Sequence, residues 1–258
     1  MTGQVLLAVE GSLARVTLSH PGKLNAMSRA MWHELREVFE RIQHDAALRC
    51  VLLAGEGGNF CAGGDIAEYP AFRFDEETLR DFHDRQVWGG LQAMLDCDVP
   101  IVAQIEGACM GAGIEMASCC DLRLAGMSAR FGAPIAKLGF PMAPREAALV
   151  MCAAGELMAR EMLLAAQVLD APTAAQRGFL NRVLPDDQLA TEAAATVARV
   201  SQLAPGAARL NKQCFRALAL DGRSQAATHL IANAYAYADS DEHREGVVAF
   251  VEKRTPQF

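Results

Sequence analysis

The chain has 258 residues, of which 52% are hydrophobic and 21% are charged, a composition typical of soluble globular proteins. A net charge of −7 argues against a nucleic-acid partner, because phosphate binding depends on an excess of Lys and Arg. No apolar run approaches the roughly 20 residues of a membrane span, and no signal peptide is visible after Met1. We therefore expect a cytoplasmic protein without a membrane partner.

The cysteines and histidines show no metal-ligand spacing. No Cys-x-x-Cys or His-x-x-x-His pair occurs among the 8 cysteines and 6 histidines. We expect no structural metal, and we interpret the cysteines as small buried apolar residues that stay reduced in a cytosol. These cysteines are Cys50, Cys61, Cys97, Cys109, Cys119, Cys120, Cys152 and Cys214.

The chain begins with a predicted β-hairpin. Residues 5–10 and 13–19 are strand-like and flank a two-residue turn, Gly11–Ser12. Ser28 is a suitable N-cap for a helix that extends to about His44. Apolar residues at helical spacing predict the buried face of this helix: Met31, Leu35, Val38, Phe39 and Ile42.

Two short apolar strands, residues 50–54 and 100–105, each lead into a glycine-rich turn that is followed by helix-like sequence. This recurrence of strand, turn and helix indicates parallel strands joined by helical crossovers, and therefore an α/β fold. Residues 122–125 and 183–184 are predicted to form further short strands.

The segment from Glu68 to Trp88 mixes aromatic residues with dense charge and lacks turn signals. Two interpretations remain open: a simple surface helix, or a mobile wall over an apolar pocket. After about residue 190 the sequence is rich in Ala and Leu, which predicts helices, including an amphipathic helix from Asp241 to Lys253. Because about 60 helical residues bury little core alone, we expect them to pack on a neighbour in the same chain or in another subunit.

The two glycine-rich turns carry most of the chemical information. They are residues 59–66 (NFCAGGDI) and 106–116 (EGACMGAGIEM). Small residues at these positions let backbone N–H groups approach a ligand without a Cβ in the way, and two such turns facing each other would bind one developing oxyanion. The second turn also carries an acid, Glu115, three residues after Ala112. This combination predicts chemistry beside a carbonyl group.

Three common nucleotide and hydrolase motifs are absent. The third glycine of a dinucleotide fingerprint would stand at Met116, and no G-x-x-x-x-G-K-[ST] loop occurs. Residues 126–130 fail the G-x-S-x-G pattern at Arg130, so no nucleophile elbow is present.

A series of short motifs runs along the chain: Leu24–Ala26, Phe60–Ile66, Pro100–Ala103, Gly111–Glu115, Cys120–Arg123, Phe131–Pro134, Leu138–Gly139 and Glu245–Arg254. In this order and spacing they resemble the crotonase (enoyl-CoA hydratase/isomerase) superfamily over nearly the whole chain. The resemblance implies a spiral of repeated ββα units in residues 1–190, which binds acyl-CoA, and a helical trimerisation region in residues 191–258. It also implies a homotrimer or homohexamer, with no cofactor apart from the coenzyme A that the substrate carries.

The resemblance assigns roles to individual residues. The N–H groups of Gly64 and Ala112 would form an oxyanion hole, and Glu115 would be the general acid/base. Lys253 would meet CoA phosphates from a neighbouring subunit. The residues expected to contact the substrate are Ala62, Asp65 and Ile66 along the CoA channel, and Lys23 and Leu24 against the adenine end.

The chain departs from the family pattern at the second catalytic acid. Family hydratases carry two catalytic glutamates, and the position that matches the second is Ile135, which can neither give nor take a proton and would only line the substrate site. Arg145 and Glu146 lie nearby and could supply a displaced acid or charge. We interpret both instead as ordinary residues at the start of a helix after Pro144, where an acid is favourable.

Other side chains near the glycine turns have structural interpretations. Asp65 is expected to cap the next helix rather than to do chemistry. Tyr69 and Trp88 are expected either to shape an acyl pocket or to pack in the core, and the sequence does not decide between these two interpretations.

The predicted function is water addition to a trans-2-enoyl-CoA by the oxyanion hole and one glutamate. Double-bond isomerisation, decarboxylation, or hydrolysis of a thioester or C–C bond on the same scaffold is the alternative, since Ile135 replaces the second glutamate. A non-catalytic acyl-CoA-binding or RNA-binding relative is a third hypothesis, which the acidic balance and the presence of Glu115 oppose.

Overall fold

The computed structural model describes residues 2–220, 229 and 240–258. Its strands are β1 (Gln4–Glu10), β2 (Leu13–Ser19), β3 (Cys50–Gly55), β4 (Ile101–Ile105), β5 (Ala108–Met110), β6 (Leu122–Gly126), β7 (Arg130–Gly132), β8 (Val168–Asp170) and β9 (Arg182–Leu184). Six of them form one sheet in the order β1-β2-β3-β4-β6-β9, and β5, β7 and β8 form a second, smaller sheet.

The α-helices are α1 (Arg29–His44), α2 (Glu76–Asp81), α3 (Trp88–Asp96), α4 (Ala112–Ser118), α5 (Pro144–Ala154), α6 (Glu156–Leu164), α7 (Ala171–Gln176), α8 (Asp186–Ser201), α9 (Pro205–Leu220) and α11 (Asp241–Glu252). Short 3-10 turns form η1 (Ile66–Ala71) and η3 (Ile135–Leu138), and η2 (Phe82–Val87) is a π-helical turn. None of the helices in the described ranges is long and apolar enough to cross a membrane.

The predicted hairpin and parallel strands are confirmed. Strands β1 and β2 pair antiparallel, and Gly11 takes the positive φ of 59° that the tight turn between them requires. The strands β2, β3, β4, β6 and β9 pair in parallel, so helical crossovers must connect them. Because β3 and β4 align Val51 with Ile101, their carboxyl ends reach the same edge of the sheet.

The prediction for α1 is also confirmed. The side-chain oxygen of Ser28 accepts a hydrogen bond from the N–H of Met31, which satisfies one of the unpaired donors at the start of the helix. The helix buries its apolar face, including Leu35 and Phe39, both fully inaccessible to solvent. Trp32 lies on the same face and is 1% exposed.

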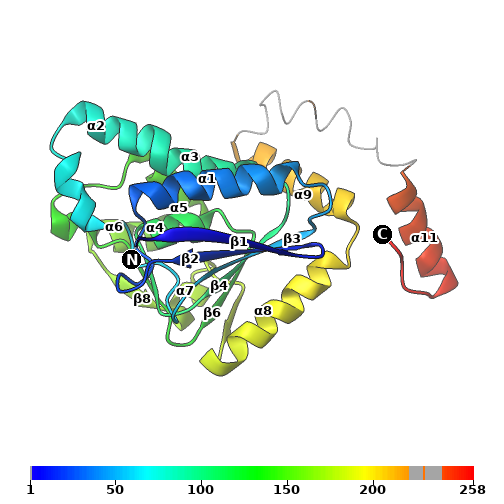
Figure 1. The fold of residues 1–258 in the computed structure, drawn as a ribbon. Helices are drawn as coiled ribbons and strands as arrows, with labels where there is room; N and C mark the ends of the chain where they lie inside the picture. Colours follow the sequence, from blue (N-terminus) through cyan, green and yellow to red (C-terminus); the bar gives the residue numbers. More distant parts are fainter. Residues whose placement is uncertain (1, 221–228, 230–239) are drawn as a thin grey trace.

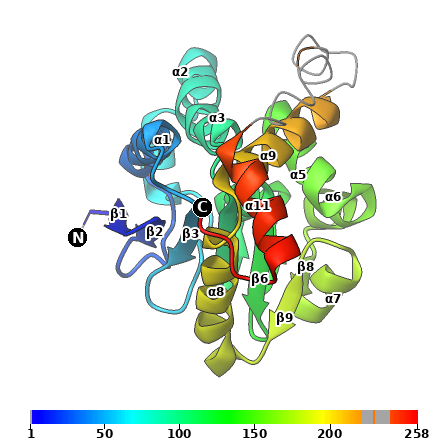
Figure 2. The ribbon, with the colours of Figure 1, turned by 90° about the vertical axis from the view of Figure 1, so that its right-hand side faces the viewer.

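Helices cover both faces of the six-stranded sheet, with α1 and α3 on one side and α8 on the other (Figure 1). The view in Figure 2, along the sheet edge, shows the same layers. Helix α8 packs through Leu189, Ala193 and Val197 against a core that includes Leu52 and Val102. It spans the boundary at residue 190 that the sequence suggested between core and C-terminal region, and that division remains a prediction.

The segment from Glu68 to Trp88 is not the simple surface helix that was one of its two interpretations. Pro70 lies inside η1, the chain then leaves helical conformation, and Asp75 caps α2 by accepting a hydrogen bond from the N–H of Thr78. Two aromatic residues on either side of the break turn inward: the rings of Phe72 and Phe82 lie 4.4 Å apart and are both buried. The segment therefore forms a wall, and its mobility remains untested.

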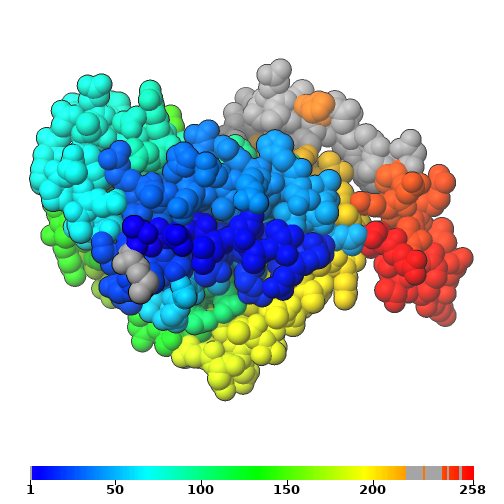
Figure 3. All heavy atoms as spheres, in the orientation of Figure 1, coloured from blue at the N-terminus to red at the C-terminus, as the bar shows by residue number. Residues whose placement is uncertain are grey.

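The C-terminal helices contact the same chain. Helix α9 is held by two ion pairs of 2.8 Å, Lys212 with Asp121 and Arg216 with Asp98. The side chain of Arg49 donates to the carbonyl oxygen of Phe258, the last residue. Figure 3 shows that α11 protrudes from one side of the molecule.

Candidate active site

The two glycine turns lie against each other. An isolated parallel bridge joins Cys61 to Cys109, in which the N–H of Cys61 donates to Ala108 and the N–H of Met110 donates to Cys61, both at 2.8 Å. A Cβ on Gly113 would lie 2.6 Å from the carbonyl oxygen of Cys61, so this approach requires glycine. The closeness of the turns that the sequence predicted is therefore present.

Among the backbone N–H groups of these turns that have no acceptor in the described part of the chain are those of Gly64 and Ala112. Ala112 is the first residue of α4, and the first N–H groups of a helix have no intrahelical partner. At Gly64, the bridge to Met27 uses the carbonyl of Gly63 and the N–H of Asp65 and leaves the N–H of Gly64 unused. Both residues line the same cavity.

This cavity has a volume of about 320 Å³ and lies between the glycine turns, the aromatic wall and η3. Six of the predicted site residues line it, namely Ala62, Gly64, Ile66, Ala112, Glu115 and Ile135. Side chains that the sequence analysis did not place there also line it: Arg73, His83, Lys137, Phe140 and Met142.

The other three predicted substrate contacts lie beside the cavity and not on its lining. Lys23 and Asp65 form an ion pair, and Asp65 also accepts a hydrogen bond from the N–H of Ala67. The prediction that Asp65 caps the following turn is therefore confirmed. Leu24 is 53% exposed, and its carbonyl accepts a hydrogen bond of 2.9 Å from the N–H of Ala62.

Asn25 ties the segment after the hairpin to the first glycine turn. Its amide nitrogen donates to the carbonyls of Glu56 and Asn59 at 2.8 and 2.7 Å, and its side-chain oxygen accepts from the N–H of His20 at 2.9 Å. Asn25 is 3% exposed and has a positive φ of 59°, which asparagine tolerates better than most residues. The site thus depends on a buried amide that no motif in the sequence singled out.

We expect Asn25→Ala to lower the free energy of unfolding by about 3 kcal/mol, because buried backbone groups lose their partners at roughly 1–3 kcal/mol each. Urea denaturation followed by far-UV circular dichroism measures this loss. Replacing Asn181, which lies outside the cavity lining, with alanine is the matched control and should cost less. An Asn25→Ala variant as stable as wild type would contradict the anchoring role.

Glu115 lies in the first turn of α4 and reaches the cavity. Burial raises the pKa of Glu115 to about 8, and the nearby charge of Glu146 adds to the rise. A carboxylic acid that stays protonated at neutral pH can donate a proton, and its conjugate base can accept one.

Glu146 differs from the ordinary helix-start residue that the sequence suggested. It does lie in the first turn of α5, but it is only 2% exposed, and its Oε1 lies 3.1 Å from Nδ1 of His83. The predicted place at the start of a helix is therefore present, and α5 in addition turns this side chain inward toward η2. Arg145 is exposed, and its guanidinium lies 5.6 Å from the ring centroid of Trp88.

The two aromatic residues left open by the sequence have different positions. Tyr69 lines the cavity, whereas Trp88 packs against the core outside the lining. The Tyr69 hydroxyl lies beside Gly64, since a Cβ on Gly64 would come within 2.2 Å of it. Burial raises the pKa of Tyr69, so its hydroxyl stays protonated at neutral pH.

The cysteines are free thiols, six of them buried, while Cys152 is exposed and Cys214 is partly exposed. The interpretation of all eight as buried residues is therefore wrong for these two, which lie on the outward sides of α5 and α9. Burial raises the pKa of Cys61, next to the cavity, to about 12, so this thiol is not an activated nucleophile. The described part of the chain contains no group of three or more His, Cys, Asp or Glu side chains arranged to bind a metal.

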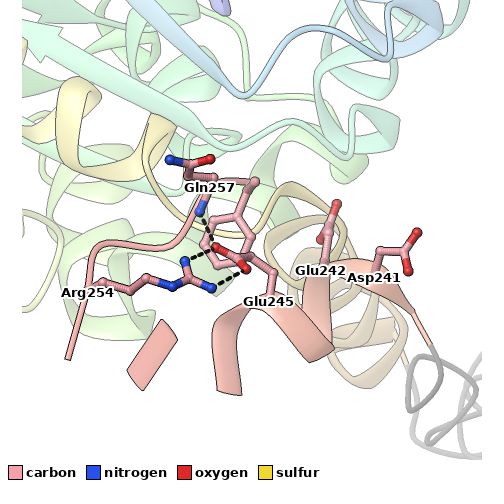
Figure 4. A pocket seen from close by; sticks show the side chains of 6 residues that line it. Asp241, Glu242, Glu245, Arg254 and Gln257 are labelled. Carbon is pink, nitrogen blue, oxygen red and sulfur yellow. Dashed lines mark hydrogen bonds and ion pairs between the residues drawn. The ribbon is translucent and has the colours of Figure 1, made fainter. Parts of the chain in front are cut away.

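A second hollow lies between α11 and the C-terminal tail (Figure 4). Its charges pair with one another: Arg254 forms an ion pair of 2.6 Å with Glu245, and the N–H of Gln257 donates to the same carboxylate. The Arg254 hydrogen bonds hold the pKa of Glu245 at about 2. These contacts fold the tail back on α11, which accounts for the hollow without a ligand.

A family model described as enoyl-CoA hydratase/isomerase matches residues 8–258. A protein of Mycobacterium bovis named "Probable enoyl-CoA hydratase" is 30% identical over 257 residues, covering 98% of this chain and 97% of that protein. The 2,3-dehydroadipyl-CoA hydratase of Escherichia coli is 30% identical over 258 residues, covering 99% and 98%. A mitochondrial Δ(3,5)-Δ(2,4)-dienoyl-CoA isomerase of Dictyostelium discoideum is 28% identical over 255 residues, covering 95% and 87%.

The fold has a close counterpart among solved structures. The crystal structure of an enoyl-CoA hydratase/carnithine racemase from Magnetospirillum magneticum superposes with a TM-score of 0.93 at 37% sequence identity, covering 100% of this chain and 96% of that one. This match confirms the predicted crotonase-like α/β fold with its helical C-terminal region.

Proposed function

Because the chain belongs to the enoyl-CoA hydratase/isomerase family, we propose that its cavity binds an acyl-CoA thioester and adds water to a trans-2-enoyl-CoA. The observation that carries this proposal is the pair of unpartnered N–H groups of Gly64 and Ala112 on a cavity that also holds Glu115. Two donors on one cavity lining suit an oxygen that gains negative charge during the reaction.

In this scheme the thioester carbonyl accepts hydrogen bonds from Gly64 and Ala112. Addition of water at the β-carbon moves an electron pair toward this carbonyl and produces an enolate oxygen, which the two N–H groups stabilise. The protonated carboxyl of Glu115 then delivers a proton to the α-carbon, and the carboxylate that this leaves takes up the proton that the added water releases. A carboxyl with a pKa of about 8 suits this role, since it carries its proton at neutral pH.

The coenzyme A part of the substrate would leave the cavity past Ala62 and Ile66, which line it. We place the adenine end near Lys23 and Leu24, at the exposed end of the same segment. Asp65 orients Lys23 by their ion pair, and Lys253 would contact a CoA phosphate across a subunit boundary. No other cofactor is needed for hydration, because water is the only co-reactant.

Double-bond isomerisation is the second candidate. The observation that favours it is Ile135 on the cavity lining, where a hydratase of this family would have a second glutamate. A single acid/base such as Glu115 suffices to move one proton between two carbons. One relative is named a dienoyl-CoA isomerase, and two others are named hydratases, so the names alone do not separate the reactions.

The experiment that tests the proposal follows the conjugated-enoyl absorbance of a short trans-2-enoyl-CoA on addition of enzyme. Hydration predicts loss of absorbance with a 3-hydroxyacyl-CoA as the product, identified by mass spectrometry as a gain of one water. A product of unchanged mass would favour isomerisation. Tight binding with no change of the substrate would contradict both and direct the search to decarboxylase and hydrolase substrates.

We also propose that the protein is a homotrimer or homohexamer. Helix α9 presents exposed apolar side chains, with Phe215 70% and Leu218 60% exposed, and Val247 of α11 is 52% exposed. Exposed apolar patches of this kind commonly mark subunit contacts. We expect light scattering to give at least three times the 27.7 kDa chain mass for wild type and a lower mass for Phe215→Asp. A monomeric wild type would contradict this proposal.

A further inference from the structure

A histidine–glutamate pair, His83 and Glu146, accompanies Glu115 at the cavity. Nδ1 of His83 lies 3.1 Å from Oε1 of Glu146. The Glu146 side chain is 3% exposed, whereas the His83 side chain is 23% exposed and lies on the cavity lining. The carboxylate therefore lies behind the imidazole, and of this pair the imidazole is the group that reaches the space for a substrate.

The neighbours of His83 indicate which ring nitrogen carries the proton. A guanidinium has donors only, and Nη1 of Arg73 lies 3.5 Å from Nε2 of His83. Nε2 thus faces a donor and Nδ1 faces a carboxylate acceptor, which favours the tautomer protonated at Nδ1. The 3.5 Å contact is too long for a strong hydrogen bond, so the Nε2 lone pair remains available to a water molecule.

We propose that His83 is the second acid/base residue of this site and that Glu146 is its positioning residue, an assignment that rests on the proposed hydration. Water gives a proton to Nε2 as its oxygen bonds to the β-carbon, and the electron pair of the double bond moves toward the thioester oxygen. Glu115 then gives its proton to the α-carbon. A proton returned from the imidazolium to the Glu115 carboxylate restores both groups.

This arrangement supplies the function that Ile135 cannot. A base oriented by a buried carboxylate is a recurrent catalytic arrangement, because the carboxylate fixes the tautomer and stabilises the imidazolium that forms.

The test compares His83→Gln and Glu146→Gln with wild type in the enoyl-CoA hydration assay at neutral pH. We expect His83→Gln to lower kcat about 10²–10³-fold, with little change in KM. Glu146→Gln should lower kcat about tenfold, and the double variant should be no worse than His83→Gln because the two residues act as one unit. His33→Gln is the matched control, since His33 faces Glu37 at 3.6 Å on the exposed side of α1.

A His83→Gln variant that keeps half of the wild-type kcat would overturn the assignment. A second readout does not depend on turnover: nitrogen NMR of histidine-labelled enzyme with bound butyryl-CoA. We expect His83 protonated at Nδ1 and unprotonated at Nε2. The opposite tautomer would refute the proposal, and a wild type that hydrates no enoyl-CoA would refute the proposed function separately.

Arg73 carries a second, independent inference. Its guanidinium carbon lies 3.6 Å from the ring centroid of Phe140 and 4.7 Å from that of Tyr69, on the cavity lining. In the described ranges no carboxylate forms an ion pair with it, and Lys137, on the same lining, likewise has none. The rings stabilise the faces of the guanidinium and leave N–H donors at its edge for a ligand.

We infer that the acyl part of the substrate carries a carboxylate, which Arg73 binds; this rests on the acyl-CoA binding proposed above. Arg73 and Lys137 place two cations on the cavity lining. Because Glu115 is protonated at neutral pH, the lining carries no anion that could pair with them. The phosphates of coenzyme A are the other anions that such a cation could meet, so the test must separate the two sources.

Isothermal calorimetry with butyryl-CoA and glutaryl-CoA, neither of which can be hydrated, measures the preference directly. We expect wild type to bind glutaryl-CoA about 10–100-fold more tightly, Arg73→Met to lose this preference, and Arg80→Met on exposed α2 to keep it. The matching pantetheine thioesters, which lack the CoA phosphates, should show the same preference. Equal affinities, or an equal loss of both ligands in Arg73→Met, would overturn the inference, whereas no binding of either CoA ester would refute the proposed function.

Discussion

Glu115→Gln is expected to lower kcat for hydration about 10²–10⁴-fold, the usual contribution of a positioned general acid. Glutamine has nearly the same shape as glutamate but cannot give a proton to the α-carbon. KM should change little, since the CoA part of the substrate does not depend on this side chain. Steady-state kinetics with a trans-2-enoyl-CoA measures the change, with Glu37→Gln on the exposed side of α1 as the control.

The pH dependence of the wild-type rate follows from the same residue. Because burial raises the pKa of Glu115 to about 8, the rate should be maintained at neutral pH and should fall about tenfold per pH unit well above 8, as the proton is lost. This alkaline fall should disappear from the residual activity of Glu115→Gln. A wild-type rate that rises through this range would show that Glu115 acts as a base instead.

The stability of the wild type should also fall as pH rises, but over a lower pH range than the rate. The pKa of Glu115 is raised in the folded chain, so between its ordinary value near 4.5 and about 8 the folded state holds a proton that the unfolded state has released. Wild-type stability relative to Glu115→Gln should therefore fall as pH rises through this range. Urea denaturation at pH 4 and pH 9 tests this: the variant should gain stability over wild type only at the higher pH.

Ala112→Pro is expected to lower kcat about 10²–10³-fold by removing one of the two N–H donors to the developing oxyanion. Proline is tolerated at the first position of a helix, where the N–H has no intrahelical partner, and the preceding Gly111 has no Cβ to clash with the ring. The substitution therefore removes the donor and leaves the other helix hydrogen bonds intact.

Ala112→Gly keeps the N–H and is the matched control, expected to retain activity within about tenfold, since the N–H itself is unchanged. Circular dichroism and binding of free coenzyme A, which has no thioester carbonyl, should be the same in both variants and wild type. If Ala112→Pro folds, binds coenzyme A and still hydrates at the wild-type rate, the N–H of Ala112 is not a catalytic donor.

The parts of the fold that the sequence predicted have local causes. Gly11 and Ser12 between two strand-like runs, and Ser28 before an apolar helical repeat, act within a few residues of themselves, so hairpin and helix appear where expected. The closeness of the two glycine turns also follows, because each ends a strand of one parallel sheet. The close approach of the turns requires glycine at residue 113, since a side chain there would collide with Cys61.

The residues that were missed depend on contacts between distant segments. His83 and Glu146 are 63 residues apart, and neither belongs to a motif, so only the folding of η2 against α5 brings them together. An acid is favourable at the start of a helix, so the position of Glu146 after Pro144 needed no further explanation. Nothing in the sequence therefore predicted that this side chain is buried. Asn25 is similar, because two of its three side-chain hydrogen bonds join residues more than 30 positions apart.

The most direct test of the account is the carbonyl stretching frequency of bound butyryl-CoA labelled with ¹³C at the thioester carbon, measured by difference infrared spectroscopy. If Gly64 and Ala112 both donate to this carbonyl, the frequency in wild type should lie below its value in water, and Ala112→Pro should shift it back toward that value. A tightly bound ligand whose frequency equals that in water would contradict the oxyanion hole, and with it the proposed reaction.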